Sequence, residues 1–132
     1  NELHKRQKAL HTPGKAYVVF LSKEHNAWIH CAAIIAVTIA GIRFEITRTE
    51  WLVILLCFAM VLAAEAFNTA IERLVNLVSP DYHPIAGDVK DIAAGAVLIC
   101  AIFAALIGLI IFVLIFKGVN LPFISLTVKD LL

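Results

Sequence analysis

The chain has 132 residues, of which 61% are hydrophobic and 16% are charged, and its formal net charge is +1. A soluble globular domain is closer to half apolar, so this composition excludes an ordinary soluble domain and indicates that most of the chain meets lipid. The small net charge gives no reason to expect nucleic acid or another polyanion as a partner. The length allows one domain, 1–132, with no room for a separate soluble catalytic domain.

The N-terminal segment 1–23 is basic and ends in a short apolar stretch between lysines. This stretch is too short to cross a bilayer, which predicts a helix lying in the membrane interface. The residues that follow, 24–30, are polar again, and Trp28 is expected to anchor this segment at the interface.

Three long apolar segments follow and predict an all-α membrane protein with three transmembrane helices after the interfacial helix. The last of them carries no charged residue between Ile92 and Phe116 and is long enough to cross a bilayer with some tilt. The polar segment between the second and third spans contains two prolines and predicts a loop. The expected spans are 29–46, 51–78 and 92–116, the loop is 79–91, and the tail is 117–132.

The distribution of lysine and arginine predicts the orientation of the chain. With three spans, the N-terminus and the segment 73–91 share one side of the membrane and carry seven Lys and Arg residues, against four on the other side. Because cytoplasmic segments are enriched in Lys and Arg, we expect the side with seven to face the cytoplasm.

A polar stripe interrupts the second apolar segment. Asn68 and Glu72 lie three and seven residues after Glu65, which places all three on one face of a helix. Glu65 follows about 21 Å of apolar helix and should therefore lie near the cytoplasmic boundary of the hydrocarbon core. Glu72 lies about 10 Å further along, at headgroup level. One helix face thus leads from an apolar depth to the cytoplasm, a geometry that suits a reaction between a lipid-borne group and a water-soluble partner.

The polar residues on the cytoplasmic side suggest phosphoryl chemistry. Magnesium prefers carboxylate oxygens together with substrate phosphates, and Glu24 and Glu72 are two carboxylates that can share such an ion. Glu65, in a drier place, can accept a proton from a hydroxyl group. Lys90, next to Asp91, can meet a phosphate as a point charge.

Each of these residues also has a simpler interpretation. Glu24, Lys90 and Asp91 can be ordinary interfacial charges, and His83 can be a loop residue. Asn26 and His30 can cap or anchor the first span. Glu65 is the hardest to explain in this way, because an ionisable group at membrane depth is costly.

These motifs, taken together over residues 15–116, resemble the prokaryotic diacylglycerol kinase family of small integral membrane proteins. Glu24-x-Asn26-x-x-Ile29-His30 and Tyr82-His83-Pro84 are more similar to its undecaprenol kinase branch. The motifs that carry the family resemblance are Glu65-x-x-Asn68-Thr-Ala-Ile-Glu72, Asp81-Tyr82-His83-Pro84 and Lys90-Asp91-x-Ala-Ala-Gly-Ala-Val. Asn76 departs from the family pattern, which usually has Asp there.

The resemblance implies a homotrimer in the bacterial inner membrane that uses MgATP at sites shared between subunits and facing the cytoplasm. It implies that Glu65 is the general base, that Glu24 and Glu72 bind magnesium, and that Asn26 and Trp28 lie with Glu65 at the lipid substrate. The expected nucleotide-binding residues are Glu24, Asn68, Glu72, Asp81, Tyr82, His83, Lys90 and Asp91.

Two alternatives remain open at the level of function. The acceptor can be diacylglycerol rather than undecaprenol, because apolar side chains accommodate either tail and discriminate weakly between similar apolar groups. A more distant alternative is a small proton- or cation-coupled transporter that uses Glu65. Such transporters of similar length have four short spans, whereas this sequence predicts three.

Overall fold

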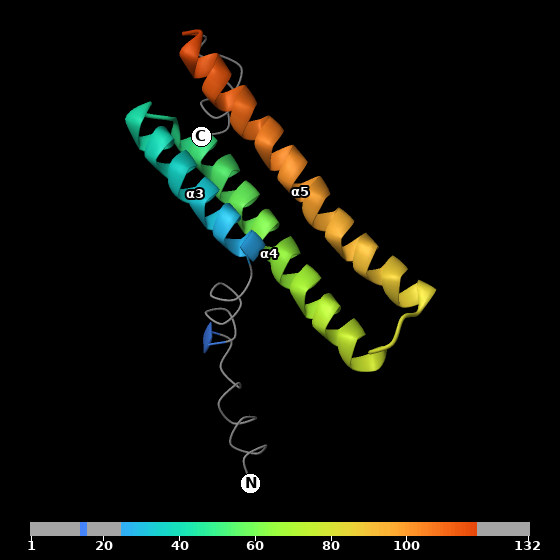
Figure 1. Ribbon diagram of the computed structural model, residues 1–132. Coiled ribbons are helices and arrows are strands. Elements are labelled where there is room, and N and C mark those ends of the chain that lie inside the picture. Colours follow the sequence, from blue (N-terminus) through green and yellow to red (C-terminus); the bar gives the residue numbers. More distant parts are fainter. Residues whose placement is uncertain (1–13, 16–24, 119–132) are drawn as a thin grey trace, which may run out of the picture.

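The computed structural model describes residues 14–15 and 25–118, which include three long helices joined by short turns (Figure 1). The predicted interfacial helix, Glu24 and most of the tail lie outside the described residues. No strand occurs in the ranges described, so the all-α prediction is confirmed there. The helices are α3 (His25–Arg43), α4 (Arg48–Val78) and α5 (Pro84–Phe116).

Helix α4 is the centre of the arrangement. It packs against both other helices, lying antiparallel to α5, while α3 lies along its N-terminal half (Figure 1). At about 1.5 Å per residue, α4 with 31 residues and α5 with 33 are each longer than the roughly 30 Å hydrocarbon core. The ends that they share at the α4–α5 turn can therefore extend beyond the apolar part of a bilayer.

The turn between α3 and α4 is fixed by local hydrogen bonds. Thr47 is the N-cap of α4, and its hydroxyl accepts a hydrogen bond from the backbone N–H of Glu50 at 3.3 Å. The Glu50 carboxylate accepts from the backbone N–H of Thr47 at 2.8 Å, which completes a capping box. These two contacts satisfy N–H groups that the first turn of a helix leaves free, and they set the start of α4 at Arg48.

Helix α5 begins earlier than the apolar pattern indicates. The sequence predicts a loop over 79–91, whereas the helix starts at Pro84 and the connection is only 79–83. Proline suits the first position of a helix, because its fixed φ is already helical and its missing N–H is not needed there. His83 caps the same turn, since its Nδ1 accepts from the backbone N–H of Ile85 at 3.2 Å. Two polar turns therefore precede the apolar part of α5.

The buried core lies at the end of the molecule that holds the α3–α4 turn. Ile46, Ile54 and Ile111 are buried there and bring the turn, α4 and α5 together. Phe44 packs edge-on against the ring of Phe112, with 6.2 Å between ring centroids. The partly buried residues around this cluster are Val37, Trp51, Phe58, Ile107, Phe112 and Ile115.

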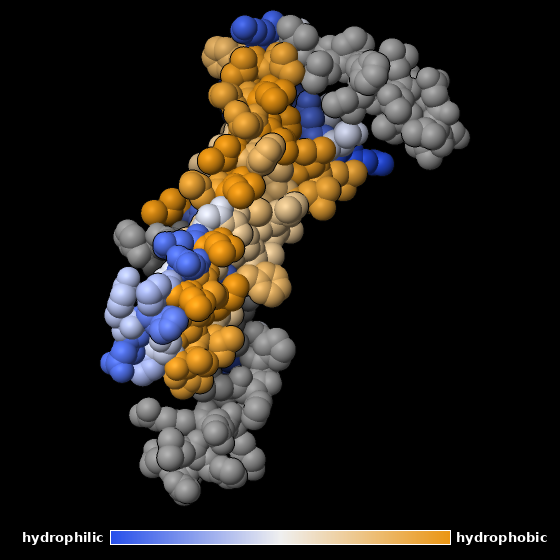
Figure 2. All heavy atoms as spheres, turned by 90° about the vertical axis from the view of Figure 1, so that its right-hand side faces the viewer, coloured by the Kyte–Doolittle hydropathy of each residue, from blue (hydrophilic) through white to orange (hydrophobic). Residues whose placement is uncertain are grey.

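Most of the remaining apolar side chains face outward. Figure 2 shows a broad apolar surface with polar side chains toward both of its ends, including a cluster at the end where α4 and α5 are joined. Among the described helices, α4 and α5 are long and apolar enough to cross a membrane, whereas the apolar part of α3, Ala27–Arg43, is shorter. That α3 crosses the membrane as well stays a prediction.

Gly41 provides the clearest test of this packing. A Cβ added at Gly41 would lie 2.7 Å from the Trp51 ring and 3.1 Å from Ile46 Cδ1, closer than side chains approach without shifting. We expect Gly41→Ala to destabilise the protein by about 1–3 kcal/mol, because overpacking displaces the ring. Thermal unfolding in detergent measures the effect.

Gly87→Ala is the matched control, because a Cβ there meets nothing within 4 Å. Alanine favours a helix over glycine by about 1 kcal/mol, so this variant should be neutral or slightly more stable. Equal melting temperatures for the Gly41 and Gly87 variants would contradict the packing described for the α3–α4 turn.

Candidate active site

Glu65 is the most distinctive side chain of the described chain. It lies within α4 and is only 3% exposed, although a charged group is rarely buried without a partner. In the described part of the chain, the buried polar side chains are Glu65 and Thr69, one helical turn apart. Glu65 therefore differs in exposure from the other charged residues toward the end of α4, which are exposed.

His30 of α3 faces this carboxylate. The distance from His30 Nε2 to Glu65 Oε2 is 3.8 Å, and the His30 side chain is 19% exposed. This separation is longer than a direct hydrogen bond, so the two groups are close but not bonded. From the sequence, His30 was expected to anchor or cap the first span. Periodicity within one helix carries no information about which residue of another helix lies opposite.

The polar stripe of α4 runs from a buried end to an exposed end. Asn68 is partly buried one turn after Glu65, and Glu72 is exposed. The exposure of these side chains increases along α4, because α3 begins at His25 and covers only the N-terminal half of α4 (Figure 1). The stripe thus runs from a buried carboxylate to an exposed one, and the membrane depths expected for the two residues stay predictions.

Lys90 connects the start of α5 with the end of α4. Its Nζ donates a short hydrogen bond to Oδ1 of Asn76. The two residues are 14 positions apart, so the contact depends on the tight turn between the helices. An amide partner holds the ammonium group in place without cancelling its charge, which leaves Lys90 able to attract an anion. Asp91, next to Lys90, is exposed.

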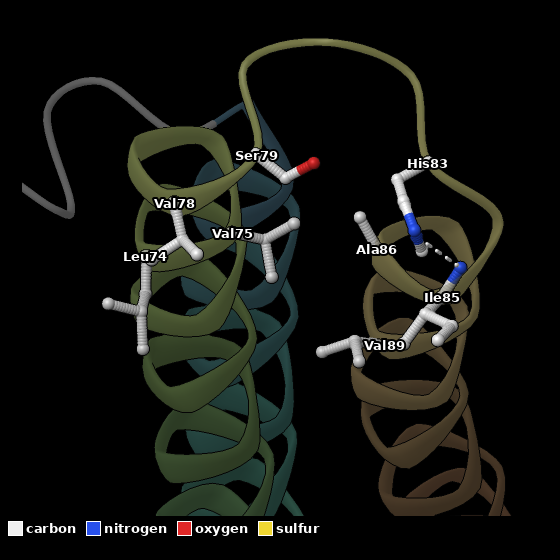
Figure 3. Close-up of a pocket in the computed structure, with 8 residues that line it drawn as sticks. All are labelled: Leu74, Val75, Val78, Ser79, His83, Ile85, Ala86 and Val89. Carbon is white, nitrogen blue, oxygen red and sulfur yellow. Dashed lines mark hydrogen bonds between the residues drawn. The ribbon is translucent and has the colours of Figure 1, made fainter.

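The residues of the short connection between α4 and α5 differ in their exposure and in their hydrogen bonds. Tyr82 is 91% exposed, and Asp81 accepts a hydrogen bond from the Ser79 hydroxyl through its backbone carbonyl at 3.1 Å. His83 turns toward α5, where it caps the helix (Figure 3). The structure therefore gives His83 a local structural contact, while a role of these three residues in nucleotide binding stays a prediction.

The pockets between the described helices include the following two. One, of about 420 Å³, is an apolar opening between the end of α4 and the start of α5, where Val75 and Val89 point toward one another (Figure 3). Of the predicted site residues, it includes only His83. The other, of about 270 Å³, lies between α3, α4 and α5, and its lining begins at His30. Of the two pockets, this second one shares a residue, His30, with the contact to Glu65.

Several predicted site residues are not brought to Glu65. Trp28 is 64% exposed, as expected of an interfacial or lipid-facing residue. Glu24 lies outside the described residues, as does the side chain of Asn26, so their roles stay predictions. Within the described ranges, no three His, Cys, Asp or Glu side chains are placed to hold a metal ion. A magnesium ion held by fewer carboxylates and by substrate phosphates does not require such a cluster.

Comparison with known proteins identifies relatives of the chain. The profile of the family described as prokaryotic diacylglycerol kinase matches residues 14–112. An undecaprenol kinase of Bacillus subtilis is 38% identical over 112 residues, which span 85% of this chain and 91% of the relative. A diacylglycerol kinase of Synechocystis is 37% identical over 86 residues, covering 64% of this chain and 49% of that protein.

A shorter match comes from a diacylglycerol kinase of Helicobacter pylori, which is 44% identical over 59 residues, or 44% of this chain and 45% of its own length. No solved structure matches the chain significantly. The range matched by the profile, 14–112, contains the polar stripe of α4, the α4–α5 turn and Lys90.

The cap at His83 can be separated from any binding role by substitution. We expect His83→Ala to lower the free energy of unfolding by about 1 kcal/mol, because the N–H group of Ile85 loses its acceptor. His83→Asn should keep the cap, since asparagine is among the best N-cap residues. Thermal unfolding of both variants tests this. Equal destabilisation by Ala and Asn would show that the imidazole ring is needed for something other than capping.

Proposed function

The chain belongs to the prokaryotic diacylglycerol kinase family and is a lipid kinase, and we propose that it transfers the γ-phosphoryl group of ATP to the hydroxyl of undecaprenol. The observation that carries the acceptor assignment is the similarity to the Bacillus subtilis undecaprenol kinase along 91% of that protein. The matches to the diacylglycerol kinases named above cover less than half of each relative, which favours undecaprenol over diacylglycerol.

Glu65 is the general base of this reaction in our proposal. The carboxylate is buried on an apolar helix, and we place it near the cytoplasmic edge of the hydrocarbon core, where a lipid hydroxyl would reach it. It takes the proton of the hydroxyl as the lipid oxygen attacks the γ-phosphorus, and the bond from that phosphorus to the departing ADP oxygen breaks. Such a transfer depends mainly on positioning and charge stabilisation, which a few polar groups can supply.

The exposed end of the site binds the nucleotide in this proposal. Lys90, held by Asn76, attracts the phosphates, and Asn68 and Glu72 lie between it and the base along α4. Glu72 offers the hard oxygen atoms that magnesium prefers, and Glu24 is proposed as the second carboxylate. A bound magnesium ion would neutralise part of the phosphate charge during transfer.

Membrane topology and assembly complete the proposal. We place all three helices across the bacterial inner membrane, with the α4–α5 turn on the cytoplasmic side, where ATP is available. The homotrimer rests on the family resemblance, and it agrees with the many large apolar side chains left exposed on one chain, for which lipid or a second copy are the available partners. Active sites shared between subunits would then combine the polar stripe with residues of a neighbour.

Removing the base should abolish turnover but not nucleotide binding. We expect Glu65→Gln to lower kcat by about 100-fold or more, because general-base catalysis contributes on this scale. Binding of MgATP should be largely unaffected, since Glu65 lies in the dry part of the stripe. Initial rates with labelled ATP, together with equilibrium binding of a non-hydrolysable analogue, measure the two effects separately.

Glu72→Gln is the matched control on the same helix face. It should weaken magnesium-dependent nucleotide binding instead, because it removes a carboxylate from the exposed end. Wild-type rates for Glu65→Gln would show that the base is assigned to the wrong residue.

The acceptor is tested by competition between two lipids. Purified protein with magnesium and labelled ATP should phosphorylate undecaprenol in mixed micelles with a kcat/KM about tenfold or more above that for diacylglycerol. A preference for diacylglycerol would keep the mechanism and overturn the acceptor. Transfer to neither lipid by folded protein, with Glu65 intact, would favour the transporter alternative, which flux driven by a proton gradient in vesicles would then test.

A further inference from the structure

The burial of Glu65 creates a requirement for repeated turnover. In the proposed reaction Glu65 takes a proton from the lipid hydroxyl in every cycle, and it must lose that proton before the next transfer. Its side chain is only 3% exposed, so water has little direct access to the carboxyl group. The other buried polar side chain in the described part of the chain is Thr69, whose hydroxyl does not take up a proton near neutral pH. Another group is therefore needed to carry the proton to solvent.

His30 is placed to take this proton. Its Nε2 lies 3.8 Å from Glu65 Oε2, so an approach of about 1 Å brings the two atoms to hydrogen-bond distance. The side chain of His30 is 19% exposed, against 3% for that of Glu65. His30 thus lies between the buried carboxyl group and a more accessible part of the surface.

The place of His30 along α3 gives the proton a short way out. His30 is five residues from His25, the first residue of α3, which is about 7.5 Å along the helix axis. We expect this end of α3 to lie at the cytoplasmic interface. An imidazole takes up and releases a proton near neutral pH, and histidine serves as a proton shuttle for this reason.

From these observations we propose that His30 is the proton relay that returns Glu65 to its ionised form after each phosphoryl transfer. The inference rests on the lipid kinase function proposed above and assigns His30 no contact with lipid or nucleotide. In the relay step, the O–H bond of Glu65 breaks and an N–H bond forms at His30 Nε2, whose lone pair is available when the proton of the neutral ring is on Nδ1. The imidazolium then releases a proton to water, so both side chains return to their starting forms.

Pre-steady-state kinetics of His30→Ala in the full-length protein tests the relay. Incubation before mixing lets Glu65 ionise, so the first transfer should proceed at the rate of the unchanged protein. Later transfers must wait for the proton to leave. The steady-state kcat should therefore fall about tenfold or more, after a burst of about one phosphorylated lipid per active site. Rapid quenching with magnesium and labelled ATP measures both phases.

Two further variants separate proton transfer from other effects of the substitution. His30→Gln keeps hydrogen-bonding groups but takes up no proton near neutral pH, so it should show the same burst and slow phase. Ile34→Ala is the matched control, because Ile34 lies one turn later on α3 and lines the same pocket as His30. It removes side-chain volume without a proton acceptor and should show no burst. A normal kcat for His30→Gln would show that His30 only holds Glu65 in place and would overturn the relay.

Chemical rescue provides a second measurement. His30 belongs to the lining of the pocket of about 270 Å³ between α3, α4 and α5, so His30→Ala leaves space there for a small molecule. Added imidazole should restore most of the steady-state kcat of His30→Ala but leave the first transfer unchanged. Pyrazole has the same ring size and is a much weaker base, so it should have no effect. Equal rescue by both compounds would indicate that the space is merely filled and would overturn the relay.

These results distinguish the relay from the kinase function itself. If the unchanged protein transfers phosphate to neither lipid, the kinase proposal and the relay fail together. If it transfers phosphate and His30→Ala has the same steady-state rate without a burst, the relay alone fails and Glu65 stands as the base. The proton would then leave by another route, such as on the phosphorylated lipid.

Discussion

The burial of one carboxylate constrains the rest of this structure. An ionised group removed from water is costly unless other polar groups replace its hydration, and Glu65 is 3% exposed on a helix that otherwise meets lipid. The N-terminal part of α3 supplies the cover. Ala27, 1% exposed, and His30 lie three residues apart and so share the face of α3 that meets α4. The small side chain of Ala27 permits close packing, and His30 brings a polar group to the carboxylate.

The two ends of the molecule differ in packing and in exposure. Near the α3–α4 turn, Ile46, Ile54 and Ile111 form a buried cluster, and the capping box at Thr47 fixes the start of α4. Toward the α4–α5 turn, packing is looser and the polar side chains are exposed, so this end can bind a water-soluble substrate. Regions with few buried contacts are where substrate-binding motions cost least. The packed end holds α3 and α4 in register, and Glu65 lies between the two regions.

Features that are determined within a single helix could be predicted from the sequence. The second span was expected over 51–78, and α4 ends at the same residue, Val78, because Ser79 and Pro80 stop the helical pattern. The isolation of Glu65 was also predictable from the apolar run that it interrupts. Contacts between helices were not, because His30 opposite Glu65, or Asn76 bonded to Lys90, depends on how two helices are placed relative to each other. The two polar turns that open α5 look like a loop in a hydropathy pattern.

The two interhelical contacts at the site have a common physical logic. Each places an ionisable side chain beside a polar side chain of another helix: an imidazole beside Glu65, and an amide beside Lys90. In the proposed reaction, a carboxylate partner of Lys90 would compete with phosphate for the ammonium group. The uncharged amide of Asn76 fixes the position of Lys90 and leaves its charge for the proposed phosphate. By this reasoning, Asn76 in place of the Asp usual in the family leaves Lys90 with more of its positive charge for an incoming phosphate.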